Sequence, residues 1–126
     1  MKAAILNNLD GTFQVGEIEI DEPRDHEVLV EVKASGLCHS DLHFAETDFG
    51  VPLPAVLGHE LAGVVIAVGP EVREFEIGDH VVGSLIQFCG HCRACNSGKT
   101  YQCTHPEETL RADEGEKPRL RGESGA

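Results

Sequence analysis

Apolar and polar residues alternate most clearly near residue 30, and this alternation predicts a β-strand. Every second residue of the stretch 27–34 is apolar and falls on one face, namely Val28, Val30, Val32 and Ala34. A period of two is expected of a strand with one buried face. The stretch 61–68 is almost wholly apolar, which predicts a strand buried on both faces.

Shorter apolar runs predict further elements on either side of these two. Strands are expected at 2–6, 13–20 and 80–83, with polar or glycine-containing turns between them. The apolar phase of 13–20 slips near Gly16, which predicts a β-bulge. A short helix is expected to begin near Cys38 and to end before Gly50. The pattern therefore predicts a mainly β fold.

The apolar signal nearly vanishes after residue 105. Charged residues and glycine follow one another there without a helical or strand period. Such a composition does not bury enough apolar surface to fold by itself. We expect one β-rich domain over residues 1–105, followed by a disordered or truncated loop over residues 106–126.

The chain is acidic, with a net charge of −12 when histidine is neutral. This charge argues against a nucleic acid partner, because neutralising phosphates requires clustered lysine and arginine, and against an anionic membrane surface. No apolar run approaches the roughly 18 residues of a membrane-spanning helix. The amino-terminal apolar run is too short for a signal-peptide core. We therefore expect a cytoplasmic protein.

Four of the five cysteines fall in one short window and predict a metal site. Cys89, Cys92, Cys95 and Cys103 can close a tetrahedron around one zinc ion, and a site closed in this way is structural. Free or disulfide-linked cysteines are one alternative. An iron–sulfur cluster is another, but seven residues precede the fourth cysteine here, where the bacterial ferredoxin run has three. His91 and His105 are expected to be exposed loop residues.

Cys38 and His59 predict a second metal site of a different kind. A thiolate and an imidazole from distant positions are ligands that catalytic zinc uses, with one coordination position left open. The positive end of the helix dipole would favour the thiolate of Cys38. Gly58 lets the backbone before His59 take an unusual dihedral angle. The alternatives are an inert buried thiol and a histidine satisfied within the core.

Taken together, these motifs resemble the zinc-dependent medium-chain alcohol dehydrogenases. The resemblance covers residues 1 to about 105 and rests on Cys38-His39-Ser40-Asp41-Leu42-His43, the Gly58-His59-Glu60 motif and the four-cysteine window. It implies a GroES-like, partly open β-barrel with a short helix and a zinc-binding loop lobe. In that family, a Rossmann domain that binds NAD or NADP follows.

The resemblance also implies roles for the residues near the catalytic metal. Cys38 and His59 would be zinc ligands, and Glu60 would lie beside the metal as an alternate ligand. Asp41 would accept a hydrogen bond from His59 and fix its tautomer, as carboxylates commonly do behind metal-bound histidines. A plain preference for the helix amino terminus is the alternative for Asp41.

Further implied roles concern the substrate and cofactor. Ser40 would hold the substrate hydroxyl and pass its proton towards His43 at the surface. His39 would lie near the cofactor pyrophosphate, and Leu85 would line the substrate pocket. A helix cap is the alternative for Ser40, and a solvated helix residue for His43.

The sequence departs from the family in lacking a Gly-x-Gly-x-x-Gly turn. The third protein ligand of the catalytic zinc is also expected outside the chain. We therefore expect an inactive fragment of an NAD(P)-dependent enzyme that acts on a small alcohol or aldehyde and forms a homodimer or homotetramer. A non-catalytic, zinc-stabilised β module for protein interaction is the alternative. Both cysteine motifs argue against the zinc-free quinone reductases.

Overall fold

The computed structural model describes residues 1–106 and 119–122, which fall into two compact units. The first unit comprises Met1–Gly83 and Pro118–Ala126, and the second comprises Ser84–Lys117. Strands dominate the first unit and loops the second. The expectation of a mainly β fold is confirmed.

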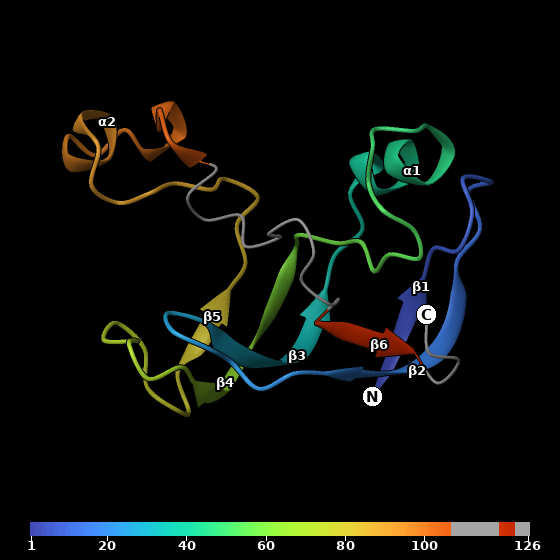
Figure 1. Cartoon of the computed structure of the whole chain (residues 1–126), viewed down its shortest axis with the longest axis horizontal. Coiled ribbons are helices and arrows are strands. Elements are labelled where there is room, and N and C mark those ends of the chain that lie inside the picture. Colours follow the sequence, from blue (N-terminus) through green and yellow to red (C-terminus); the bar gives the residue numbers. More distant parts are fainter. Residues whose placement is uncertain (107–118, 123–126) are drawn as a thin grey trace. The chain divides into compact units, whose positions relative to one another are not determined.

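The first sheet joins the two ends of the first unit. Strands β1 (Lys2–Ile5), β2 (Gln14–Ile20) and β6 (Leu120–Gly122) pair antiparallel in the order β1-β2-β6 (Figure 1). The expectation of a disordered or truncated loop over 106–126 is therefore wrong for the residues of β6. The remainder of that prediction, 107–118 and 123–126, lies outside the described residues.

Gly16 does not mark a bulge, contrary to the sequence-based expectation. The β1–β2 register runs without interruption from Lys2 opposite Glu17 to Ile5 opposite Gln14. A Cβ atom at Gly16 would lie 2.9 Å from Cδ1 of Ile5. The glycine therefore makes room for a neighbouring side chain within a regular strand pair.

The second sheet contains the two strands with the strongest sequence signals. Strands β3 (Val28–Ser35), β4 (Leu61–Val68) and β5 (His80–Val82) pair antiparallel in the order β3-β4-β5. The β3–β4 register shifts twice, so bulges occur where regular alternation was expected. The described strands form two open sheets and no closed barrel.

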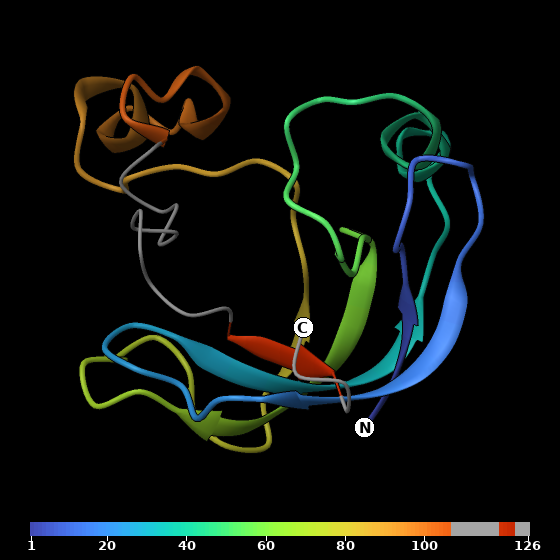
Figure 2. The same ribbon diagram turned by 45° about the vertical axis from the view of Figure 1, so that its right-hand side comes forward.

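Helix α1 (His39–Glu46) connects β3 to the loop before β4, as the sequence predicted. The Gly11 N–H donates to the Ala45 carbonyl at 3.0 Å, and Leu6 pairs with Ala55 through two backbone hydrogen bonds of 2.8 and 2.9 Å. Figures 1 and 2 both show α1 at one end of the first unit, beside the loops that follow β1 and α1.

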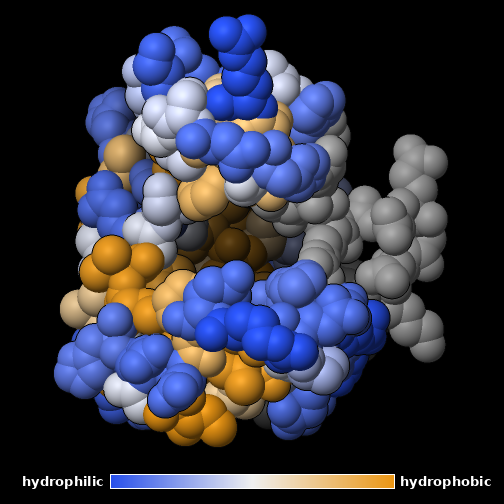
Figure 3. All heavy atoms as spheres, turned by 90° about the vertical axis from the view of Figure 1, so that its left-hand side faces the viewer, coloured by the Kyte–Doolittle hydropathy of each residue, from blue (hydrophilic) through white to orange (hydrophobic). Residues whose placement is uncertain are grey.

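Few side chains are fully buried. In the described part of the chain, the buried apolar residues are Leu6, Ile18, Ala45, Val65 and Val72. Val32, predicted to lie on a buried face, is 52% exposed, and Ile66 in the supposedly buried strand is 45% exposed. Figure 3 shows apolar residues exposed among hydrophilic ones on one face. None of the described helices has the length and apolar character needed to cross a membrane.

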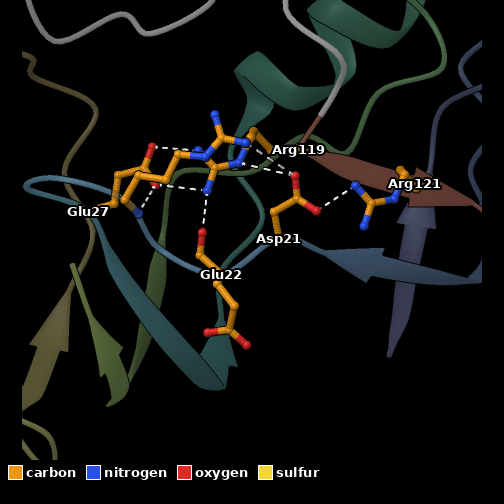
Figure 4. Close-up of polar contacts among 6 residues, drawn as sticks. Asp21, Glu22, Glu27, Arg119 and Arg121 are labelled. Carbon is orange, nitrogen blue, oxygen red and sulfur yellow. Dashed lines mark hydrogen bonds and ion pairs between the residues drawn. The ribbon is translucent and has the colours of Figure 1, made fainter. Parts of the chain in front are cut away.

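Ion pairs attach β6 to the start of the second sheet (Figure 4). The Arg119 guanidinium donates to both carboxylate oxygens of Glu27 at 3.0 and 2.9 Å and to the Glu22 carbonyl at 2.6 Å. Asp21 pairs with both Arg119 and Arg121. The side chains of Arg119, Glu27 and Asp21 are each about three-quarters buried. Water therefore screens these ion pairs only partly.

The second unit is a loop-rich lobe, as the family resemblance implied. Its described residues contain helix α2 (Arg93–Asn96) and the 3₁₀ helix η1 (Thr100–Gln102), and no strand. Gly90 and Gly98 have φ of +82° and +77°, a region that glycine enters without strain. None of its described side chains is fully buried. Among the described residues, apolar packing therefore contributes little to holding this lobe together.

Candidate metal centres

The first candidate centre brings together Cys38, His59 and Glu60. One ligand atom from each of these residues lies within 4.8 Å of the others. Cys38 caps the amino terminus of α1, and the other two residues come immediately before β4. A hydrogen bond of 2.9 Å from the Gly36 N–H to the Glu60 carbonyl holds the two segments side by side.

Two glycines shape the backbone of this centre. Gly58 has φ of +124°, which confirms the unusual dihedral angle expected before His59. At Gly36, a Cβ atom would collide with Oε2 of Glu60 and lie 3.1 Å from the Glu60 Cβ. Gly36 therefore leaves the space into which the Glu60 carboxylate folds.

Asp41 lies between the helix start and the imidazole. Its Oδ2 accepts a hydrogen bond from the Cys38 N–H at 3.0 Å, the arrangement of a helix-capping carboxylate. Its Oδ1 lies 3.8 Å from Nδ1 of His59, which is longer than a hydrogen bond. The structure thus shows Asp41 as a helix cap, which was the alternative. Asp41 lies near His59, but no hydrogen bond joins the two side chains.

The surroundings of Cys38 favour its ionised form. Hydrogen bonds from the side chain and then the backbone of Ser40, followed by one from His59, lower the pKa of the Cys38 thiol. A thiolate is the form that ligates metals and acts as a nucleophile. Ser40 therefore contacts the sulfur of Cys38, a role that the sequence did not suggest.

The other residues predicted to act near this centre lie at the surface. His39 and His43 are both exposed on α1, with ring centroids 4.5 Å apart and ring planes at 89°. Leu85 is 64% exposed and belongs to the second unit. Its place in a substrate pocket stays a prediction.

The second candidate centre lies within the lobe and contains four thiols. The sulfurs of Cys89, Cys92, Cys95 and Cys103 lie within 4.8 Å of one another, and all are free cysteines. Two sulfur pairs are 3.5 and 3.6 Å apart. A single ion with Zn–S bonds of about 2.3 Å requires tetrahedral sulfurs about 3.8 Å apart, so the spacing fits one ion.

Backbone N–H groups point at these sulfurs. Those of Cys89 and His105 donate to Sγ of Cys103, each at 3.3 Å, and that of Cys92 donates to Sγ of Cys89 at 3.4 Å. Such donors stabilise negative charge on the sulfurs. The side chains of His91 and His105 are exposed, as expected, and neither is in the group of ligand atoms.

The four thiols are not equivalent in the metal-free state. Hydrogen bonds from the backbones of Cys95 and Thr104 lower the pKa of the Cys92 thiol to about 5. Partial burial and then the neighbouring Cys92 sulfur raise the pKa of the Cys95 thiol to about 12. One thiolate therefore suppresses ionisation of its neighbour, and a cation is needed before all four can lose their protons.

Sequence reasoning missed two contributors to these centres. Gly36 accommodates the Glu60 carboxylate, and Thr104 donates to Cys92. Each lies next to a motif that was recognised, but its contact depends on the fold and not on the local pattern.

Comparison with known proteins supplies a family match. A family model described as the alcohol dehydrogenase GroES-like domain matches residues 24–122. An NDMA-dependent alcohol dehydrogenase from Amycolatopsis methanolica is 48% identical over 102 residues, which are 81% of this chain and 28% of the relative. The chain thus spans less than a third of the length of that curated relative.

Solved structures agree with this match. The crystal structure of an alcohol dehydrogenase zinc-binding domain protein from Burkholderia ambifaria is 41% identical, with a TM-score of 0.82 over 98% of this chain and 34% of that one. Benzyl alcohol dehydrogenase from Acinetobacter calcoaceticus is 36% identical, with a TM-score of 0.76 over 94% of this chain and 33% of that one.

Proposed function

Because the chain belongs to the alcohol dehydrogenase GroES-like domain family, we propose that it forms the zinc-binding part of an NAD- or NADP-dependent alcohol or aldehyde oxidoreductase. The observation that carries the proposal is the convergence of Cys38, His59 and Glu60 within 4.8 Å. One thiol, one imidazole and one carboxylate form a donor set that suits zinc in a catalytic role.

The residues present fit such an ion. Cys38 is favoured as a thiolate by Ser40 and His59, and Gly36 leaves room for the Glu60 carboxylate. A bound zinc ion would supply Lewis-acid stabilisation of the substrate oxygen. Cys38 and His59 would be its ligands, with Glu60 as the alternate ligand beside it. Asp41 would orient His59 from behind.

The chain's own residues would also manage the substrate proton. Ser40 would hold the substrate hydroxyl and pass its proton towards His43, which is exposed to solvent. A hydroxyl and an imidazole in series can carry a proton out at neutral pH. His39 would lie near the cofactor pyrophosphate and Leu85 beside the substrate. Hydride acceptance would belong to the nicotinamide cofactor.

The four-thiol centre would hold a second, structural zinc ion. The sulfur spacing supports one ion, whereas a cluster of several irons would keep its thiolates further apart. All four ligands come from the lobe, so no position is left for a substrate. Cys89, Cys92, Cys95 and Cys103 would each supply one sulfur.

The proposal extends to the whole protein. A small alcohol or aldehyde is the expected substrate, in line with the names of the relatives. Assembly as a homodimer or homotetramer and a cytoplasmic location remain part of the proposal. A polypeptide of these 126 residues alone should not turn over an alcohol with NAD or NADP, because no Gly-x-Gly-x-x-Gly turn is present in them.

Cobalt substitution tests the two centres separately. Co²⁺ added to the metal-free chain under anaerobic conditions should occupy the four-thiol centre tightly and the Cys38 centre more weakly, each with a thiolate-to-cobalt absorption band. Cys38→Ser should remove the weaker band and Cys95→Ser the stronger one. His26→Gln, which changes an exposed histidine paired with Glu71, should leave both bands. Two unchanged bands in Cys38→Ser would contradict the proposal.

An activity assay tests the proposed chemistry. In the whole protein, Ser40→Ala should lower kcat for a primary alcohol by about a hundredfold or more, because the proton path is interrupted. The Cys95→Ser variant should lower the stability of the protein, because the four-thiol centre is proposed to be structural. A non-catalytic interaction module would show no reduction of NAD or NADP by any alcohol tested.

A further inference from the structure

Two histidines on helix α1 form a pair that the proposed zinc ligation does not use. His39 and His43 are four residues apart, so their side chains lie on the same face of the helix, one turn from each other. Their ring centroids are 4.5 Å apart and the rings meet edge to face. Both side chains are exposed.

The ring nitrogens of this pair are available to a ligand. Within residues 1–106 and 119–122, neither imidazole has a hydrogen bond or an ion pair, and the two rings contact each other edge to face. An ion bound to both rings with metal–nitrogen bonds of about 2.1 Å needs two nitrogens about 3 Å apart. Because nitrogens lie on the ring rims, centroids 4.5 Å apart are compatible with that distance.

We propose that His39 and His43 together bind a divalent transition-metal ion at the surface of α1, separate from the two cysteine-containing centres. Two histidines at positions i and i+4 of a helix are a known zinc-binding arrangement. Imidazole suits zinc, copper and nickel alike, and water would complete the coordination. The chain's net charge of −12 also favours an incoming cation.

This inference does not depend on the proposed oxidoreductase activity. If His43 does carry a proton and His39 does lie beside the cofactor, an ion held by both rings would occupy the proton exit and the edge of the cofactor site. The pair would then make the enzyme sensitive to free transition metal in the range where this site fills. Metal binding itself is measurable in the isolated chain.

The probe is Ni²⁺, which is paramagnetic and does not oxidise thiols readily. The chain is first given two molar equivalents of zinc, enough to fill its two thiolate centres, and unbound zinc is removed. Ni²⁺ is then titrated while amide NMR signals are recorded. Line broadening should centre on residues 39–46. Calorimetry gives the affinity. Broadening centred on another part of the chain would overturn the proposal.

Variants separate the pair from single histidines. His43→Gln and His39→Gln should each weaken Ni²⁺ binding by about a hundredfold, because one ligand replaces a chelating pair. His43→Gln combined with Glu46→His keeps the number of histidines but places them about 10.5 Å apart along the helix, beyond one ion, and should not restore binding. His26→Gln should bind Ni²⁺ as the unchanged chain does.

These variants alter exposed side chains, and circular dichroism checks that the helix is retained. Unchanged Ni²⁺ affinity in His39→Gln and His43→Gln would refute the paired site. Unchanged Ni²⁺ affinity in the variant with histidines at 39 and 46 would refute the paired site as well. Those two histidines cannot share one ion, so binding would then need only one of them.

Discussion

At the scale of single residues, the contact between Gly36 and Glu60 couples two sequence motifs. Glu60 follows His59, whereas Gly36 precedes Cys38, and these two neighbours are the proposed metal ligands. The Glu60 carboxylate folds over Gly36, and a hydrogen bond joins the two backbones. The absence of a side chain at position 36 therefore determines where a carboxylate next to the candidate catalytic metal can lie.

Gly36→Ala is expected to displace that carboxylate without unfolding the chain. The new Cβ atom would collide with Oε2 at the end of a flexible side chain, which can rotate away, and the Glu60 Cβ at 3.1 Å would have to shift by a few tenths of an ångström. The affinity of the Cys38 centre for Co²⁺ should fall about tenfold, equivalent to about 1.4 kcal/mol. Absorption titration measures this affinity.

Glu60→Gln is the control for that substitution, because it keeps the shape of the side chain and removes its charge. Both variants should weaken Co²⁺ binding to a similar extent. If Glu60→Gln weakens binding and Gly36→Ala does not, the carboxylate does not need the space above residue 36.

The cysteines of the metal-free lobe should differ in reactivity with pH. Because the pKa of Cys92 is lowered to about 5, its reactive thiolate forms above about pH 5, well below the usual range of about 8.5. Cys95, with a pKa of about 12, should stay protonated between about pH 5 and 8.5. At pH 6 to 7, iodoacetamide should modify Cys92 first, as mass spectrometry of peptides can show. Added zinc should protect both. Equal labelling of Cys92 and Cys95 at pH 6 would contradict the assignment.

At the scale of elements, strand β6 depends on side chains far away in the sequence. Its pairing with β2 covers only three residues, from Ile18 opposite Gly122 to Ile20 opposite Leu120. Arg119 adds two charged hydrogen bonds to Glu27 and one to the Glu22 carbonyl. A two-pronged guanidinium–carboxylate pair fixes direction as well as contributing energy.

Arg119→Met should loosen β6 while leaving the rest of the first unit folded. It removes the charged hydrogen bonds and leaves Glu27 partly buried, so a loss of about 1–2 kcal/mol is expected after allowing for partial exposure. Hydrogen exchange of the Asp21 amide, which donates to the Arg119 carbonyl at 3.1 Å, reports on the docking directly. Urea unfolding gives the free energy.

Arg121→Met serves as the matched control, since Arg121 makes one ion pair and is about half exposed. Its effect should be the smaller of the two. A double-mutant cycle with Glu27→Gln isolates the Arg119–Glu27 coupling. If the Asp21 amide exchanges rapidly in both arginine variants, Arg119 has no special role in holding β6 against the first unit.

The sequence predicted elements whose formation depends on local pattern. Alternating and continuous apolar runs located β3 and β4, and the cysteine spacing located the four-thiol cluster. It did not predict β6, because the partners of Arg119 lie about ninety residues earlier. Likewise, Gly16 broke the apolar pattern for a reason that only the neighbouring strand reveals, namely the space taken by Ile5.

At the scale of the whole molecule, the two units are stabilised by different interactions. The first has two sheets and all five of the fully buried apolar residues found in the described part of the chain. The described portion of the second has none, and three of its backbone N–H groups donate to cysteine sulfurs. A unit without a core needs another source of stability, and small domains commonly obtain it from a metal.

Metal removal should therefore affect the units unequally. With zinc bound, the four sulfurs would be linked through one ion, a contribution on the order of 10 kcal/mol to the folding of the lobe. After chelation, amides of the lobe such as Asn96 and Cys103, which donate to nearby carbonyls, should exchange rapidly. Amides of the β3–β4 pair should keep their protection, because apolar packing and strand pairing hold them. Hydrogen exchange measured by mass spectrometry distinguishes the two units.

Cys95→Ser in the presence of zinc should reproduce the exchange pattern seen after chelation. Simultaneous loss of protection in both units would show that they fold as one.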